Sequence, residues 1–323
     1  MSGARNNTAI ATTAIDSNSV SARPYVGRFA PSPTGPLHLG SLAAAVASYL
    51  EARSRRGRWL IRIEDLDQPR VVAGMADQHL RTLEVFGFQW DGTVRVQSEH
   101  IGTYEEALAR LRRLGNVYEC TCSRAAIAAL SPRRGADSEE ESHYPGLCRA
   151  GARHPGRAAA WRFIAPDREI SFVDHWQQRC SDNVAAGVGD FIVRRRDGIV
   201  AYQLAVVVDD ALQGVTNVVR GCDLVTSTSR QILLQAALEL PCPGYAHAPL
   251  IVAAGGQKLS KSAHAIGIAT GAPGAILAGV LALLEQDVPR ELARATVTEV
   301  WSWALANWNT EALRGLRSVE VPM

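Results

Sequence analysis

The sequence has very little lysine. Of its 34 basic residues only two are lysines, Lys258 and Lys261, and both lie in the segment Lys-Leu-Ser-Lys-Ser at residues 258–262. An ammonium group is a compact charge on a flexible stem, so it can follow a phosphate whose geometry changes, whereas a guanidinium prefers a fixed bidentate partner. The pair therefore predicts a cationic loop that acts on phosphates. The alternative is a solvated loop in a chain whose codon usage favours arginine.

The sequence also lacks features of several other protein classes. It has no apolar run of the roughly 20 residues that span a bilayer, so we expect a soluble, cytoplasmic protein with no membrane partner. Six cysteines in 323 residues are too few for a disulfide scaffold and fit a reducing compartment. A net charge of +2 excludes a globally basic field. Any nucleic acid must then meet local arginine clusters, at residues 53–58, 110–113 or 194–196, although a cluster of this kind is more often a solvated face.

The order of patterns along the chain predicts an α/β fold. Residues 25–30 alternate like a strand, residues 37–52 have helical spacing, and residues 58–63 form a second strand. Together they predict a right-handed βαβ unit, in which ligands bind at the carboxyl ends of the parallel strands. Further helices are expected at residues 75–86, 101–114, 201–210 and 224–238, further strands at 159–164, 189–194, 215–220 and 244–252, and a mostly helical tail at 273–319.

The loop between the first strand and the first helix carries a candidate phosphate site. His38-Leu39-Gly40-Ser41 stands where this loop meets the helix. The first turn of a helix presents unpaired backbone amides to an anion, and an imidazole can add a side-chain donor. The alternative is a plain strand-to-helix turn with a surface histidine, and this loop alone does not decide between them.

Three segments, in this order, resemble the catalytic core of class I aminoacyl-tRNA synthetases. They are Pro-Ser-Pro-Thr-Gly-Pro-Leu-His-Leu-Gly-Ser at residues 31–41, Arg-Ile-Glu-Asp-Leu-Asp at 62–67 and the lysine segment at 258–262. Residues 38–41 stand in place of the HIGH signature and residues 258–262 in place of KMSKS. Gly-Arg-Phe-Ala-Pro-Ser-Pro-Thr-Gly at 27–35 is similar to the glutamyl branch in particular, and the resemblance covers residues 24–270.

This resemblance implies a Rossmann-like catalytic domain in a ligase that uses ATP with Mg²⁺ and L-glutamate. It implies catalytic roles for His38, Gly40, Lys258 and Lys261. It also implies that ATP is bound by His38, Gly40, Ser41 and Lys261.

A glutamate substrate needs a cation for its side-chain carboxylate and an anion for its ammonium group. Arg28 and Glu64, at the ends of the first two strands, are suited to these two tasks. A surface ion pair between them is the alternative. Tyr202, which could also be a core residue, matches a further glutamate-contacting position by resemblance. The other positions that the resemblance implies are Phe29, Ala30, Pro31, Ser32 and Arg220.

Three of the six cysteines lie close together in the sequence. Cys120-x-Cys122 and Tyr144-x-x-x-Cys148 supply three thiolates and one oxygen for a tetrahedral Zn²⁺ site, with His143 as another possible fourth ligand. The alternative is unrelated cysteines around a disordered loop. Resemblance to the branch of glutamyl-queuosine tRNA(Asp) synthetases, which carry Cys-x-Cys…Tyr-x-x-x-Cys in an inserted module, implies one Zn²⁺ held by Cys120, Cys122, Tyr144 and Cys148. The 21 residues between Cys122 and Tyr144 make an unusually long gap for that branch.

The same resemblance implies what the activated glutamate is passed to. The 61 residues after Ser262 are too few for the helical anticodon-binding portion of full-length glutamyl-tRNA synthetases. Glutamyl-adenylate then passes its glutamate to the queuosine base in the anticodon of tRNA(Asp), and Leu66 in Glu-Asp-Leu-Asp agrees with this branch. One alternative is a compact glutamyl-tRNA synthetase that charges a tRNA 3′ end. Another is a catalytically silent tRNA-binding paralogue, against which the intact His38, Gly40 and Lys261 argue.

The expected domain organisation follows from these segments. We predict a disordered N-terminal extension at residues 1–22 and a catalytic domain at 23–115 and 151–252. Between its two parts lies an inserted zinc-binding module at 116–150. The lysine-containing loop and a helical C-terminal region occupy 253–323, and we expect a monomer.

Overall fold

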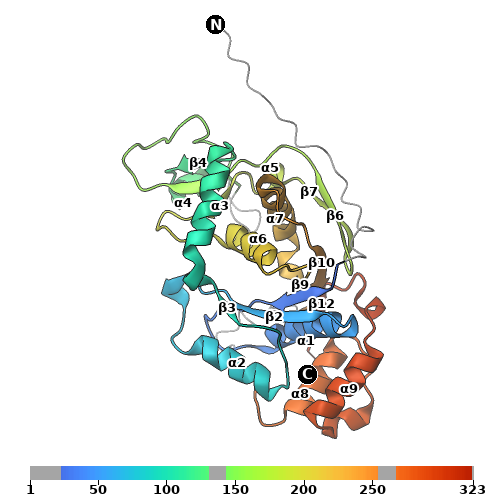
Figure 1. The fold of residues 1–323 in the computed structure, drawn as a ribbon. Helices are drawn as coiled ribbons and strands as arrows, with labels where there is room; N and C mark the ends of the chain where they lie inside the picture. Colours follow the sequence, from blue (N-terminus) through green and yellow to red (C-terminus); the bar gives the residue numbers. More distant parts are fainter. Residues whose placement is uncertain (1–22, 131–142, 254–266, 322–323) are drawn as a thin grey trace.

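The computed structural model describes residues 23–130, 143–253 and 267–321, and Figure 1 shows how their elements are arranged. The helices are α1 (Leu39–Ser54), α2 (Met75–Val85), α3 (Ile101–Arg113), α4 (Arg124–Leu130), α5 (Val184–Gly187), α6 (Tyr202–Leu212), α7 (Val225–Leu238), α8 (Pro273–Leu283) and α9 (Val297–Asn307). The strands are β1 (Val26–Phe29), β2 (Arg58–Ile63), β3 (Arg95–Val96), β4 (Val117–Cys120), β5 (Ala160–Phe163), β6 (Ile170–Asp174), β7 (Gln178–Asp182), β8 (Phe191–Arg194), β9 (Asn217–Gly221), β10 (Gly244–Ala248), β11 (Leu250–Val252) and β12 (Ser318–Glu320).

Two parallel sheets meet edge to edge at the centre of the molecule. One has the strand order β1-β2-β3, and the other has β9 and β6 on either side of β10 with β7 as an antiparallel edge. At the junction of β1 and β9, Thr216 donates its backbone N–H to the carbonyl of Val26 at 2.9 Å. The predicted unit of β1, α1 and β2 is confirmed, since β1 and β2 pair in parallel. β1 therefore has β2 along one edge and β9 along the other. Where the strand order reverses in this way, a ligand crevice opens at the carboxyl ends of the strands.

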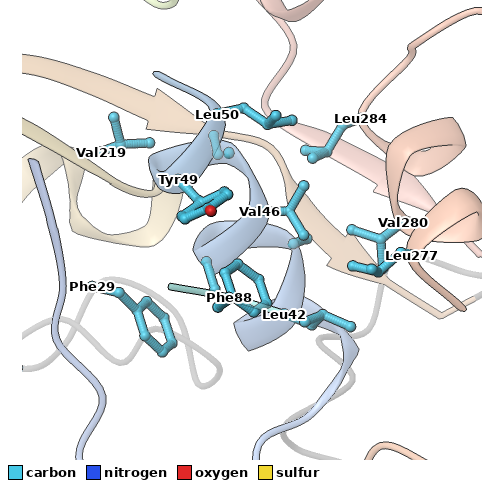
Figure 2. Close-up of a cluster of buried hydrophobic side chains, with 14 of the residues drawn as sticks. Phe29, Leu42, Val46, Tyr49, Leu50, Phe88, Val219, Leu277, Val280 and Leu284 are labelled. Atoms are coloured by element: carbon cyan, nitrogen blue, oxygen red, sulfur yellow. The ribbon is translucent and has the colours of Figure 1, made fainter. Parts of the chain in front are cut away.

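Helix α1 is buried along most of its length. Its sequence, Leu-Gly-Ser-Leu-Ala-Ala-Ala-Val-Ala-Ser-Tyr-Leu-Glu-Ala-Arg-Ser, is rich in small side chains that allow close packing on several sides. Figure 2 shows Leu42, Val46 and Leu50 of α1 facing the side chains contributed by α8 and its C-terminal end. Burying each such Leu or Val contributes about 1.5–3 kcal/mol. This packing fixes the N-terminal turn of α1, where the predicted phosphate site lies, against a rigid core.

A second apolar core lies between α3, α6, α7 and the antiparallel sheet of β4, β5 and β8. The cysteine-bearing segment begins in β4, which pairs with β5 in register from Val117 with Phe163 to Cys120 with Ala160. The side chains of Cys120, Cys122, Ile127, Tyr144 and Cys148 form a small buried cluster of their own. The segment therefore shares a sheet with residues that follow it, while its own apolar contacts are local.

The structure departs from the predicted elements in three places. The predicted strand at residues 244–252 is two strands, because Pro249 has no N–H to donate between β10 and β11. The tail is not wholly helical, because β12 pairs in parallel with β11. The hairpin of β6 and β7 was not predicted from the sequence. No helix in the three described ranges is both long and apolar enough to cross a membrane.

Candidate active site

A pocket of about 610 Å³ opens where the strand ends of β1, β2 and β9 meet the N-terminus of α1. The pocket lies at the topological switch point, where the strand order on the two sides of β1 reverses. Ten of the residues predicted from the sequence to bind glutamate or ATP line it. They are Arg28, Phe29, Ala30, Pro31, Ser32, His38, Ser41, Glu64, Tyr202 and Arg220. Lys258 and Lys261 lie outside the described residues.

His38 caps the first turn of α1. Its backbone is extended, and its Nδ1 accepts a hydrogen bond from the backbone N–H of Ser41 at 3.3 Å. Burial lowers the pKa of His38, against the opposing effect of the Asp223 carboxylate. A neutral imidazole that accepts at Nδ1 carries its proton on Nε2, so the ring keeps one donor for a ligand. This geometry adds a side-chain donor to the free amides of the helix N-terminus.

Gly40 lies in the first turn of α1 beside the imidazole. A Cβ at this position would stand 3.1 Å from Cε1 and 3.2 Å from Nδ1 of His38. Any larger residue would therefore press on the ring that caps the helix. The glycine predicted as catalytic from the sequence thus has a steric reason, since it leaves room for His38.

Arg28 is buried at the end of β1, with 3% of its surface exposed. Its Nε donates to Oδ1 of Asp210 at 3.4 Å, and its Nη1 donates to the carbonyl of Val219 at 3.2 Å. The alternative of a surface ion pair with Glu64 is wrong, because the guanidinium is buried and bridges β1 to α6 and β9. Arg28 can still present its remaining N–H groups to a ligand carboxylate.

Glu64 follows β2 and is held by its neighbour Arg62. The guanidinium donates to Oε1 of Glu64 through Nε at 3.3 Å and Nη2 at 3.1 Å, and it also donates to Asp210 through Nη1 at 2.7 Å. Burial raises the pKa of Glu64, although the guanidiniums of Arg62 and Arg28 oppose the change. Among the described residues no hydrogen bond reaches the other carboxylate oxygen of Glu64, so it can accept one from a ligand ammonium, whose positive charge would favour the ionised form.

Tyr202 and Arg220 complete the predicted set from the far side of the pocket. Tyr202 begins α6 and is half-buried, while Arg220 in β9 is 6% exposed. Arg220 donates through Nη1 to the hydroxyl of Tyr202 at 3.3 Å. Because the tyrosine oxygen accepts this bond, its own proton is free for a ligand. The two side chains act as neighbouring donors, and Tyr202 is not a fully buried core residue.

Several residues that shape the pocket were missed in the sequence. His79 of α2 lines it and contacts the carbonyl of Gly35 through Nε2 at 2.8 Å. Within the described part of the chain, its buried Nδ1 has no hydrogen-bond partner. Asp209 and Asp210 were missed although their sequence signal is visible, since two adjacent aspartates interrupt the apolar run of α6. Both are buried. Asp209 accepts a hydrogen bond from Arg95 of β3, and Asp210 accepts one from Arg62 of β2.

The predicted metal ligands come together beside β4. The sulfur atoms of Cys120, Cys122 and Cys148 lie within 4.8 Å of one another, and all three thiols are free and buried. The Tyr144 hydroxyl is 3.2 Å from Sγ of Cys120, and Sγ of Cys122 is 3.5 Å from Sγ of Cys148. A tetrahedral zinc ion with Zn–S bonds of about 2.3 Å needs sulfurs about 3.8 Å apart, so these residues fit a zinc ion. His143 instead contacts the carbonyl of Ala185 at 2.9 Å.

The protonation of Cys148 also suits a metal ligand. Burial acts to raise its pKa, but hydrogen bonds from Tyr144 and from two backbone amides outweigh this effect and lower the pKa to about 6. The thiolate is the form that binds metals. The backbone next to this cluster is constrained as well, because Gly189 has φ of +74° and a Cβ there would collide with the carbonyl of Tyr144.

Some arginines of the predicted clusters are paired with carboxylates. Arg195 bridges to Asp67 at 3.1 Å and to Asp197 at 2.6 Å, and Arg194 bridges to Glu105 at 2.9 Å. Surface pairs of this kind contribute little to stability and exchange easily with solvent. These arginines therefore fit a solvated face as well as a surface that meets phosphates.

Comparisons with known proteins find similar proteins over most of the chain. Residues 25–271 match the family described as tRNA synthetases class I (E and Q), catalytic domain. The chain is 49% identical over 290 residues to a glutamyl-Q tRNA(Asp) synthetase from Dechloromonas aromatica, covering 90% of this chain and 96% of the relative. It is 51% identical over 286 residues to the protein of that name from Thiobacillus denitrificans, covering 88% and 94%. The crystal structure of a glutamate tRNA ligase from Elizabethkingia meningosepticum, in complex with its amino acid, superposes with a TM-score of 0.75 at 24% identity, covering 93% of this chain and 67% of that one.

Proposed function

Because the chain belongs to the glutamyl-Q tRNA(Asp) synthetase family of class I synthetases, we propose that it activates L-glutamate with ATP and transfers the glutamate to queuosine in tRNA(Asp). One observation carries the activation step, namely the pocket that gathers two guanidiniums, a carboxylate and a helix N-terminus. Glutamate has two carboxylates and one ammonium group, so its charges are complementary to Arg28, Arg220 and Glu64. This pocket thus offers one partner for each charged group of the substrate.

Activation follows from the position of His38 relative to these residues. The α-carboxylate of glutamate attacks the α-phosphorus of ATP, giving glutamyl-adenylate and pyrophosphate. His38 Nε2–H and the amides of the first turn of α1 would stabilise the negative charge that develops on the phosphate oxygens. Lys261 and Lys258 would stabilise the negative charge on the α- and β-phosphates, and Mg²⁺ bound to ATP would neutralise part of that charge.

The acceptor separates this proposal from a compact glutamyl-tRNA synthetase. Both enzymes would form the same adenylate, and they differ in the hydroxyl that takes the glutamate. The names of the relatives at about 50% identity favour the queuosine base over the 3′-terminal adenosine. A silent tRNA-binding paralogue has no need of the pocket's matched charges.

We propose one zinc ion per chain at Cys120, Cys122, Tyr144 and Cys148. The fit of the three sulfurs and the phenol oxygen supports it, and a zinc ion bound there would stabilise the fold of this segment without taking part in the reaction. We also propose the division into a catalytic domain, an inserted module at 116–150 and a C-terminal region from 253. The separate small core around the cysteines supports the second of these units.

Glutamate-dependent ATP–pyrophosphate exchange, measured without tRNA, tests the activation step. We expect exchange with L-glutamate and none with L-glutamine, because an uncharged amide leaves a guanidinium of the pocket without its anion. Glu64→Gln should raise the KM for glutamate strongly while the KM for ATP stays near its wild-type value. A wild-type protein that catalyses no exchange with glutamate would contradict the proposal.

A further inference from the structure

Arg220 is a buried cation with an unusual set of partners. In the part of the chain that the structure describes, every group that accepts a hydrogen bond from its guanidinium is uncharged. Burying a charge without an opposite charge beside it is costly. Arg28 and Arg62 differ, since each has a carboxylate within hydrogen-bonding distance. Among the described residues, Arg220 therefore has no carboxylate hydrogen-bonded to its guanidinium, and it can pair with an anionic ligand.

The Nε of Arg220 is held by a histidine that is itself completely buried. Arg220 Nε donates to Nε2 of His247 in β10 at 3.0 Å, so this ring nitrogen must be unprotonated. His247 Nδ1 lies 2.5 Å from Oδ2 of Asp174, the last residue of β6. The histidine proton must then be on Nδ1, where the carboxylate accepts it. The opposite tautomer would place two N–H groups against each other at 3.0 Å.

Asp174 is held just as firmly as the histidine. Its Oδ1 accepts the backbone N–H groups of Trp176 at 3.0 Å, Gln177 at 2.8 Å and His247 at 3.2 Å. Burial would raise the pKa of Asp174, but the hydrogen bonds from His247 and from backbone amides outweigh it and lower the pKa. Burial lowers the pKa of His247, and Arg220 adds to this while Asp174 opposes it. The carboxylate thus stays ionised and the imidazole neutral.

We propose that Asp174 and His247 are positioning residues for glutamate binding. Asp174 fixes the tautomer of His247, and the Nε2 of His247 then fixes the guanidinium of Arg220 in the orientation that receives a carboxylate of glutamate. Neither residue lines the pocket, so both act through Arg220. The inference rests on the proposed function, because it takes glutamate as the ligand of this pocket.

Two substitutions of His247 distinguish the roles of its two ring nitrogens. In His247→Gln, the longer amide can place its oxygen near the position of Nε2 and accept from Arg220. In His247→Asn, the shorter amide stands near the position of Nδ1, keeps a donor for Asp174 and leaves Arg220 Nε without an acceptor. We expect His247→Asn to raise the KM for glutamate about ten-fold or more, with kcat and the KM for ATP within about two-fold. His247→Gln should raise the KM for glutamate much less than His247→Asn does.

Asp174→Asn tests the tautomer in the same exchange assay. The introduced amide can donate to Nδ1, which would move the histidine proton to Nε2 against Arg220 and raise the KM for glutamate about ten-fold. The same substitution made together with His247→Gln should add little, because an amide has no tautomer to set. His175→Gln, which changes an exposed histidine next to Asp174, is the matched control and should leave both KM values unchanged.

The KM values distinguish the possible outcomes. A variant that only folds less well would lower the apparent kcat and leave the KM for glutamate unchanged. If His247→Asn and Asp174→Asn behave in this way, the inference is overturned. The inference is also overturned if Asp174→Asn raises the KM for glutamate as much in the His247→Gln background as it does in the wild-type protein. If the wild type catalyses exchange and the His247 and Asp174 variants have its KM for glutamate, only this inference is contradicted. Absence of wild-type exchange contradicts the proposed function and this inference with it.

Discussion

Gly40→Ala should impair catalysis without destabilising the fold, because its Cβ would press on one particular side chain. The added methyl group would lie 3.1 Å from Cε1 and 3.2 Å from Nδ1 of His38. Contacts this short force the imidazole to move by a few tenths of an ångström. The hydrogen bond from Ser41 N–H to Nδ1 is already 3.3 Å long, so the movement would weaken the cap and misplace the Nε2–H donor.

The expected effects on stability and on activity differ. Replacing glycine by alanine within a helix stabilises a protein by about 0.5–1 kcal/mol. Weakening the cap at His38 costs about 1 kcal/mol, so the free energy of unfolding should stay near its wild-type value. A small displacement of a group that stabilises the transition state lowers the rate much more, and we expect the exchange rate to fall roughly ten-fold.

Gly102→Ala is the matched control for this experiment. Gly102 is the second residue of α3, as Gly40 is of α1, and no atom lies within 4 Å of a Cβ built there. This variant should gain about 0.5–1 kcal/mol in urea unfolding and exchange pyrophosphate like the wild type. In a His38→Ala background, Gly40→Ala should cost no further activity, because no ring remains to be displaced. If the single variant Gly40→Ala exchanges pyrophosphate at the wild-type rate, the reasoning is refuted.

Three further predictions concern the lysine segment, the cysteines and Glu64. Lys261→Arg keeps the charge but should lower the exchange rate severely with an unchanged melting temperature; near-normal exchange would mean that the lysine pair reflects composition only. The wild type should hold about one zinc per chain by metal analysis, and Cys120→Ser should lose it; an active, folded and metal-free wild type would contradict the zinc site. Because burial raises the pKa of Glu64, its protonation should begin at a higher pH than that of an ordinary glutamate. As the pH is lowered, the KM for glutamate should therefore begin to rise at a higher pH than an ordinary glutamate would give, and Glu64→Gln should show a high, pH-independent KM.

The sequence carried strong local signals for the core of the fold and for much of the pocket. The glycine- and proline-rich turn before α1 and the acidic residues after β2 lie next to the elements that position them, so the unit of β1, α1 and β2 could be predicted from neighbouring residues. Arg28, His38 and Glu64 come together because the carboxyl ends of parallel strands share one edge. Their spacing in the sequence contains this information.

The groups that support the pocket could not be predicted in the same way. His247 and Asp174 are 73 residues apart, and their contact depends on β6 and β10 lying side by side. Arg62 of β2 and Asp210 of α6 are 148 residues apart, and no local pattern pairs them. Pairing of β11 with β12 likewise joins two short segments that are too brief to be recognised individually. Such contacts depend on tertiary structure, which a local pattern does not contain.

The acceptor of the glutamate is the central claim, and locating the label on the tRNA tests it most directly. The protein would be incubated with ATP, labelled glutamate and tRNA(Asp) with or without queuosine, and the tRNA would then be digested to nucleosides. The account predicts label on the queuosine nucleoside of the modified tRNA and none on the queuosine-free tRNA. Label on the 3′-terminal adenosine of both tRNAs would contradict it and would identify a compact glutamyl-tRNA synthetase instead.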